Sequence, residues 1–124
     1  MVLVDTSVWI DHLRKGDAAL TAALEGGRVL MHPFVLGELA CGNLNDRAGL
    51  LALLRDLPKA PVATDAEALG FIDRHALMGR GIGYIDVHLL ASAALANPAR
   101  LWTRDKRLAK VADHLNLAFH LQAH

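Results

Sequence analysis

Two acidic residues of this chain follow short apolar runs of the kind that form buried strands. The run 2–4 is rich in β-branched side chains and too short for a helix, so it predicts a strand buried on both faces, and Asp5 comes directly after it. Asp105 stands at the corresponding point after a second apolar run, 101–103. Because parallel strands share one carboxyl edge, where open α/β sheets build their ligand crevices, we expect Asp5 and Asp105 to meet there.

Two further acids should be carried to that edge by helices. Glu38 is the one charged residue between Val29 and Asn45, and an unpaired acid among apolar side chains is costly, so we expect it to enter the same crevice. Asp86 occupies the first turn of an almost wholly apolar helix expected over 84–96. Each acid also has a purely structural alternative. Glu38 could be a surface residue, Asp86 could stabilise the helix dipole, and the other two acids could cap helices.

Four carboxylates that converge on one crevice repel one another unless a divalent cation lies among them. Hard oxygen ligands select Mg²⁺ or Mn²⁺, which also bind substrate phosphates. Neither the histidines nor the single cysteine, Cys41, has the spacing typical of a zinc site. The acids therefore predict a Mg²⁺ or Mn²⁺ site that acts on a substrate containing phosphate.

A cluster of basic residues surrounds Asp105. The stretch 100–110 contains five arginines and lysines and no other acid, as the printed sequence shows. We predict that Arg104, Lys106 and Arg107 hold phosphates of a nucleic acid beside the metal site. The alternative is an ordinary solvated helix face.

The rest of the chain predicts an alternation of strands and helices. Thr64 and Glu67 have the spacing of a capping box, which predicts a helix from there to about Leu77. Further strands are expected over 28–32, around 62, over 100–103 and over 117–119, and further helices over 8–14, 18–24, 34–41, 46–57 and 105–114. Strands separated by helices imply right-handed crossovers and a parallel sheet. We expect residues 1–124 to form one three-layer α/β domain, with four or five short strands flanked by helices.

Composition narrows the class of protein. With 53% hydrophobic and 21% charged residues, the 124-residue chain is typical of a compact domain with a real core. Its 13 basic and 13 acidic residues balance, which argues against a protein that coats polyanions. A single cysteine excludes an internal disulfide and fits a reducing compartment. No signal peptide and no apolar run long enough for a membrane span is visible, so we expect a cytoplasmic protein that does not associate with membranes.

Together these motifs resemble those of PIN domains, specifically the VapC toxins of bacterial and archaeal toxin–antitoxin pairs. The resemblance covers essentially the whole chain and depends on the order and spacing of four segments. They are Leu3-Val4-Asp5-Thr6-Ser7, the helical Leu36-Gly37-Glu38-Leu39, Asp86 before an alanine-rich helix, and Thr103-Arg104-Asp105. The chain departs from the family pattern at Ile85, where many relatives have a polar residue beside the acid.

The resemblance implies a function for these positions. It implies an endoribonuclease that depends on Mg²⁺ or Mn²⁺, is inhibited by a cognate VapB-like antitoxin and is usually dimeric. The acids that match the family's acidic positions are Asp5, Glu38, Asp86 and Asp105. Ser7 and Thr103 match its nearby hydroxyl positions, and RNA rather than DNA as the substrate is likewise implied by the family alone.

Three other functions fit the sequence less well. An aspartyl-phosphate phosphatase with Asp5 as nucleophile needs a second acid two residues on, where Ser7 stands. A Mg²⁺-binding signalling domain of the receiver type needs an acid pair near the first strand and a lysine after the last, and neither is placed convincingly. A degenerate PIN-like domain that only binds is disfavoured because all four acids are present.

Apolar residues also suggest protein partners. Trp9 and the leucine-rich stretch 46–57 exceed what one small core needs. We therefore predict a homodimer, and a groove that takes an antitoxin segment by helix-in-groove contacts. An arginine of that segment would enter the acidic site.

Overall fold

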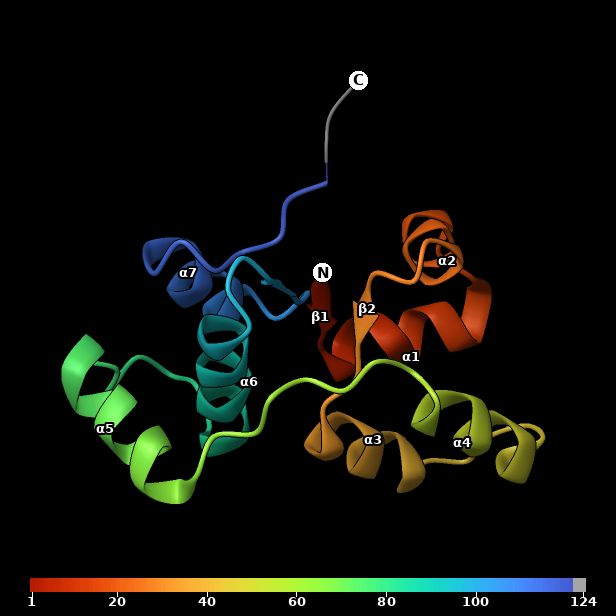
Figure 1. The fold of residues 1–124 in the computed structure, drawn as a ribbon, viewed down its shortest axis with the longest axis horizontal. Helices are drawn as coiled ribbons and strands as arrows, with labels where there is room; N and C mark the ends of the chain where they lie inside the picture. Colours follow the sequence, from red (N-terminus) through yellow and green to blue (C-terminus); the bar gives the residue numbers. More distant parts are fainter. Residues whose placement is uncertain (122–124) are drawn as a thin grey trace.

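The computed structural model describes residues 1–121, which fold around a small parallel sheet (Figure 1). Its strands are β1 (Val2–Val4), β2 (Val29–Leu30) and β3 (Arg100–Trp102), in the order β2-β1-β3. Both neighbours run parallel to β1, with Val2 opposite Val29 on one side and Arg100 on the other. All three β1 side chains are buried, which confirms the prediction of a central strand covered on both faces.

Seven helices surround this sheet in the described part of the chain. They are α1 (Thr6–Lys15), α2 (Ala18–Glu25), α3 (Pro33–Ala40), α4 (Arg47–Arg55), α5 (Asp65–His75), α6 (Tyr84–Leu95) and α7 (Lys106–His114). In the view of Figure 1, α5, α6 and α7 lie on one side of β1 and β2, and α1, α2 and α4 on the other. The fold is therefore the expected α/β arrangement, with helices flanking a parallel sheet.

Local sequence accounts for where the helices begin and how deeply they pack. The predicted capping box is present at α5, where Thr64 and Glu67 each bind the other's backbone N–H. Pro33 begins α3, where its missing N–H costs nothing. Helix α6 packs against β1 and β3 and is buried continuously over residues 87–93, as its apolar sequence predicts.

The sheet is smaller than predicted: residues 1–121 contain three strands, not four or five. The expected last strand over 117–119 reduces to one bridge between Leu101 and Ala118. It is closed by two hydrogen bonds, Leu101 N–H to the Leu117 carbonyl (2.6 Å) and Phe119 N–H to the Leu101 carbonyl (2.9 Å). One parallel bridge is too short to count as a strand, so no ladder forms at this edge of β3.

The opposite edge shows the same reduction. The strand expected around Val62 is a single bridge at Lys59, opposite Met31. Pro58 and Pro61 lie on either side of Lys59, and proline has no N–H to extend the ladder. Both expected outer strands are thus single bridges, and the regular sheet consists of β2, β1 and β3.

Burial corrects one further expectation. Trp9 is 2% exposed and belongs to the single hydrophobic core, so it is not available as an interface residue. Leu53 on α4, in contrast, is 69% exposed, which keeps the leucine-rich helix as a candidate contact surface. No helix within residues 1–121 has the length and apolar character needed to cross a membrane.

Candidate active site of four carboxylates

Asp5 and Asp105 lie at the carboxyl edge of the sheet, as predicted. Asp5 follows β1, and its N–H continues the pairing by donating to the Trp102 carbonyl of β3 (2.9 Å). Asp105 is the third residue after the end of β3 and forms the N-cap of α7. Neighbouring parallel strands that end together therefore place residues 100 positions apart in the chain at one edge.

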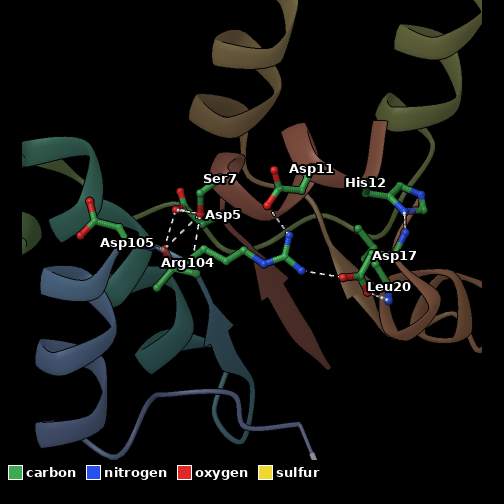
Figure 2. Close-up of polar contacts among 9 residues, drawn as sticks. Asp5, Ser7, Asp11, His12, Asp17, Leu20, Arg104 and Asp105 are labelled. Carbon is green, nitrogen blue, oxygen red and sulfur yellow. Dashed lines mark hydrogen bonds and ion pairs between the residues drawn. The ribbon is translucent and has the colours of Figure 1, made fainter. Parts of the chain in front are cut away.

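Two hydroxyl groups fix the Asp5 carboxylate. The Thr103 and Ser7 hydroxyls both donate to Asp5 Oδ2, at 2.7 and 2.8 Å (Figure 2). Ser7 Oγ in turn accepts the backbone N–H of Arg104 (3.0 Å), and Thr103 Oγ1 accepts that of Asp105 (3.1 Å). This network joins the turn after β1 to the loop after β3, and so sets the position of Asp105 relative to Asp5.

The other three acids are each held through one oxygen. Asp105 Oδ1 accepts the N–H groups of Arg107 (2.9 Å) and Leu108 (3.1 Å), the helix cap that sequence had offered as the alternative explanation. Asp86 Oδ2 accepts the Gly83 N–H at the start of α6 (3.0 Å). Each of these carboxylates keeps a second oxygen that has no hydrogen-bond partner among the residues described.

Glu38 differs from its prediction in one respect. Its side chain is exposed, not surrounded by apolar residues, because α3 packs into the core through Val35 and Leu39 and leaves the Glu38 side open. Its Oε1 accepts the hydroxyl of Thr6 at the start of α1 (2.7 Å). Glu38 is thus directed to the turn that carries Asp5, although not by the desolvation that the sequence suggested.

Electrostatics shows that the four acids form one group. Partial burial raises the pKa of Asp86 above its ordinary value, and the negative charges of Asp5, Asp105 and Glu38 raise it further. The hydrogen bond from Gly83 N–H acts in the opposite direction and does not cancel the increase. The three carboxylates that act on Asp86 are the three that sequence grouped with it.

The donor set fits a hard divalent cation in type and charge. Four carboxylates, each with one oxygen anchored by the protein, leave four oxygens of the kind that Mg²⁺ and Mn²⁺ prefer. Within residues 1–121, no three acidic, histidine or cysteine side chains already enclose one point closely enough to hold an ion. Glu38 and Asp105 are exposed, so their free oxygens can turn toward a cation without disturbing the core.

The predicted basic residues fall into two groups. Arg104 points away from Asp105 in Figure 2 and pairs with Asp11 (2.6 Å) and Asp17 (2.5 Å). Lys106 and Arg107 are exposed in the first turn of α7 and make no ion pair among the residues described. Arg104 is therefore held as a bridge between elements, and the other two remain available to phosphates.

Several residues that shape the site were not predicted. Thr6 orients Glu38, and its place between Asp5 and Ser7 is the signal that could have identified it. Gly83 orients Asp86 through its backbone, which no side-chain pattern reveals. Asp11 and Asp17 hold Arg104 across distances of 93 and 87 positions along the chain, beyond the reach of spacing arguments.

Comparison with known proteins agrees with this geometry. A family model for the PIN domain matches residues 2–114. The chain is 51% identical over 108 residues to Ribonuclease VapC32 of Mycobacterium tuberculosis, in strain CDC 1551 / Oshkosh and in strain H37Rv. The matched part covers 87% of this chain and 87% of each relative. A match of this extent, over a chain that places the four acids at one sheet edge, confirms the resemblance seen in the motifs: the chain belongs to the PIN-domain family, with VapC-type ribonucleases as relatives.

Proposed function

We propose that this chain is a metal-dependent endoribonuclease, the toxin of a VapBC-type pair, which hydrolyses phosphodiester bonds in RNA. The observation that supports this most directly is that Asp5, Glu38 and Asp105 lie near enough to Asp86 for their charges to add to the increase in its pKa that burial causes. The likeness to proteins named Ribonuclease VapC32 supports RNA as the substrate. We further propose a single PIN-like domain over residues 1–124 that acts in the cytoplasm.

Each residue has a proposed role. Asp5, Glu38, Asp86 and Asp105 would hold Mg²⁺ or Mn²⁺, and the bound cation would supply an activated water and a clamp on the phosphate. Ser7 and Thr103 keep the Asp5 carboxylate in one orientation by donating to its Oδ2. Lys106 and Arg107 at the start of α7 bind phosphates on either side of the scissile bond.

The test replaces each acid by its amide. Asp5→Asn, Glu38→Gln, Asp86→Asn and Asp105→Asn should each abolish the cleavage of a mixture of structured RNAs in Mg²⁺ or Mn²⁺, while circular dichroism shows that the fold is kept. Asp73→Asn is the matched control, because this exposed acid lies on α5 outside the site. Sequencing the RNA ends should show 5′-phosphates and 3′-hydroxyls. An amide variant that cleaves at the parent rate would exclude its residue from the site.

A cavity beside the acids supports the proposed antitoxin contact. It has a volume of about 650 Å³ and lies between α1, α3 and α4, with Glu38 at its border. Ile10 and Leu13 of α1 line it and are 44% and 37% exposed, so apolar surface is left uncovered. We propose that it receives an apolar antitoxin helix whose arginine reaches the carboxylates. Leu13→Asp should then release a co-purified antitoxin, whereas Leu69→Asp, at an exposed leucine of α5, should not.

The proposed homodimer concerns a different measurement. Leu53 leaves a large apolar side chain in solvent on α4, which a second copy of the chain would cover. Light scattering of the purified chain at micromolar concentration should give the mass of two copies, and Leu53→Glu should shift it toward one. A strict monomer in the parent protein would remove the dimer from the proposal.

A further inference from the structure

A further cavity lies between α7 and the glycine-rich loop that precedes α6. It has a volume of about 460 Å³ and is bordered by the glycine-rich loop before α6 and by α7. Its lining residues are Gly79, Arg80, Arg107, Lys110, Val111 and His114. Three cationic side chains and an imidazole thus face one cavity, and no acidic residue lines it.

The positive charge of this cavity has no counter-charge in the protein. Among residues 1–121, Arg80, Arg107 and Lys110 form no ion pair with any carboxylate. Arg104, only three positions from Arg107, is by contrast neutralised by two acids. Like charges gathered without a partner repel one another, and a bound anion would remove that repulsion.

Two contacts hold the cationic groups in place. Arg80 Nη2 donates to His114 Nδ1 at 3.0 Å, which joins the loop to the end of α7 across the cavity. The aliphatic stem of Arg107 passes over Gly81, where an added Cβ would lie 2.8 Å from Arg107 Cδ. Gly81 has φ +81°, so it supplies both the left-handed backbone and the space that Arg107 occupies. The cavity is therefore organised by backbone and side-chain contacts, and is more than a chance meeting of mobile surface charges.

The two segments that form the cavity also carry two of the four acids. Arg107 donates its backbone N–H to Asp105, and Gly83, two residues after Gly81, donates its own to Asp86. A nucleic-acid strand whose reacting phosphate lies at the acids has further phosphates on either side of it. One of them can enter a cationic cavity that shares these segments.

We propose that this cavity binds one backbone phosphate of the RNA next to the cleavage site, through Arg80, Arg107 and Lys110, with His114 keeping Arg80 in position. This inference rests on the proposed ribonuclease function and adds a defined substrate-positioning site to it. Arginine guanidinium groups bind phosphate oxygens with two parallel hydrogen bonds, and lysine adds a point charge. The site reads the backbone and not the base, so it fixes the register of the strand without selecting its sequence.

The first experiment measures RNA binding without cleavage. Fluorescence anisotropy with a short single-stranded oligouridine, in chelator, compares the parent chain with Arg80→Gln/Lys110→Gln. The double variant should bind about tenfold more weakly, as expected for the loss of a charge-assisted contact. Its plot of log affinity against log salt should be shallower by about 0.7, the contribution of one phosphate on a single strand. Arg55→Gln/Lys59→Gln removes the same charge near α4, far from α7 in Figure 1, and should match the parent.

A second experiment tests the cavity without RNA. Titration with inorganic phosphate, followed by NMR, should shift the amide signals of Gly79 and Gly81 in the parent and leave them unmoved in the double variant. If the parent cleaves RNA but the double variant binds it as tightly and with the same salt dependence, the cavity proposal is wrong and the ribonuclease stands. If the parent neither binds nor cleaves RNA, the proposed function itself fails, and the phosphate site in it fails too.

Discussion

Asp86 is the acid whose protonation should govern the behaviour of the metal-free site. Its raised pKa means that the folded protein binds a proton more tightly than the unfolded chain, where the group has its ordinary value of 3.8. The free energy of unfolding should therefore fall as the pH rises above 3.8 and through the raised pKa of the folded state. A cation that binds the folded state only should reverse it.

Asp86→Asn tests this sign directly. The amide oxygen can still accept the Gly83 N–H while the charge is lost, so in chelator at pH 7 the variant should be more stable than the parent. Mn²⁺ at 100 times its Kd should stabilise the parent by about 2.7 kcal/mol, and the variant by much less. Urea melts of both proteins with chelator and with Mn²⁺ measure these differences. If Mn²⁺ stabilised both proteins by the same free energy, Asp86 would not be a metal ligand.

The four acids could be grouped from the sequence because of where they stand relative to the predicted strands and helices. Asp5 and Asp105 follow strands, and Asp86 begins a helix with almost no other polar group, so their convergence followed from parallel topology. The environment of Glu38 was predicted wrongly, since apolar neighbours along a helix do not tell which side faces the core. The sequence did not single out Arg80, because only the fold of the glycine-rich loop brings it to α7.

At the scale of elements, Arg104 joins three segments that carry or support the site. Its guanidinium connects α1, through Asp11, with the start of α2, through Asp17, while its backbone belongs to the loop that carries Asp105. A hydrogen bond from the Leu20 N–H, and to a smaller extent one from the Arg104 guanidinium, hold the pKa of Asp17 below its ordinary value. The sequence predicted that Arg104 binds phosphate, whereas in the structure it forms ion pairs that connect three segments.

A double-mutant cycle measures the contribution of the Arg104–Asp17 ion pair to stability. Asp17→Asn keeps a side chain that caps α2 but removes the charge, and Arg104→Gln removes its partner. The coupling free energy in urea unfolding should be about 0.5–1 kcal/mol, because the guanidinium is 36% exposed and solvent screens the pair. It should decrease in high salt. A coupling of zero at low salt would return Arg104 to the set of residues free to bind RNA.

Helices α3 and α6 meet through a stack of aromatic rings in which His32 is buried. The Phe34 ring lies with its centroid 5.0 Å from those of His32 and of His88. Burial, and to a smaller extent the charge of the neighbouring His88, lower the pKa of His32 from 6.5 to about 4. Between these two values the unfolded chain binds the proton and the folded one does not, so stability should fall as the pH falls from about 6.5 to about 4.

His32→Asn should weaken this dependence on pH. His32 Nδ1 accepts the Phe34 N–H at the start of α3 (3.0 Å), and an asparagine oxygen can take the same role without titrating. Over that interval the slope of unfolding free energy against pH should become flatter by up to about 1.4 kcal/mol per pH unit. Urea melts at several pH values provide the measurement, with exposed His120→Asn as the control. An unchanged slope would mean that His32 is protonated in the folded protein.

The elements themselves were largely predictable from sequence, and the extent of the sheet was not. Strands β1 and β3 and the order of the helices follow from apolar runs, caps and glycines. Whether 117–119 forms a strand depends on how far the chain follows its neighbour after Ala118, which is a property of the packed molecule. Single bridges of this kind have the same local sequence as true strands.

At the scale of the whole molecule, positive and negative charges are equal in number but gather in different places. The net charge is zero, yet the acids gather at the sheet edge, and a cationic cavity lies beside them on α7. An RNA strand that crosses both would meet metal ligands at one phosphate and cations at the next. Local arrangement, which composition alone conceals, therefore supports a nucleic-acid substrate despite the neutral total.

The central place of β1 determines when this protein can become active during its own translation. β1 is made long before β3, which pairs along one of its sides, and the hydrogen bond from Thr103 to Asp5 joins residues 98 positions apart. A nascent chain that ends before β3 can pair β1 with β2 on one side only, and it lacks Asp105. Chains stalled at residue 99 should therefore be digested rapidly by protease and leave RNA intact. The ribosome that makes this ribonuclease is thus shielded from it until β3 and Asp105 have emerged.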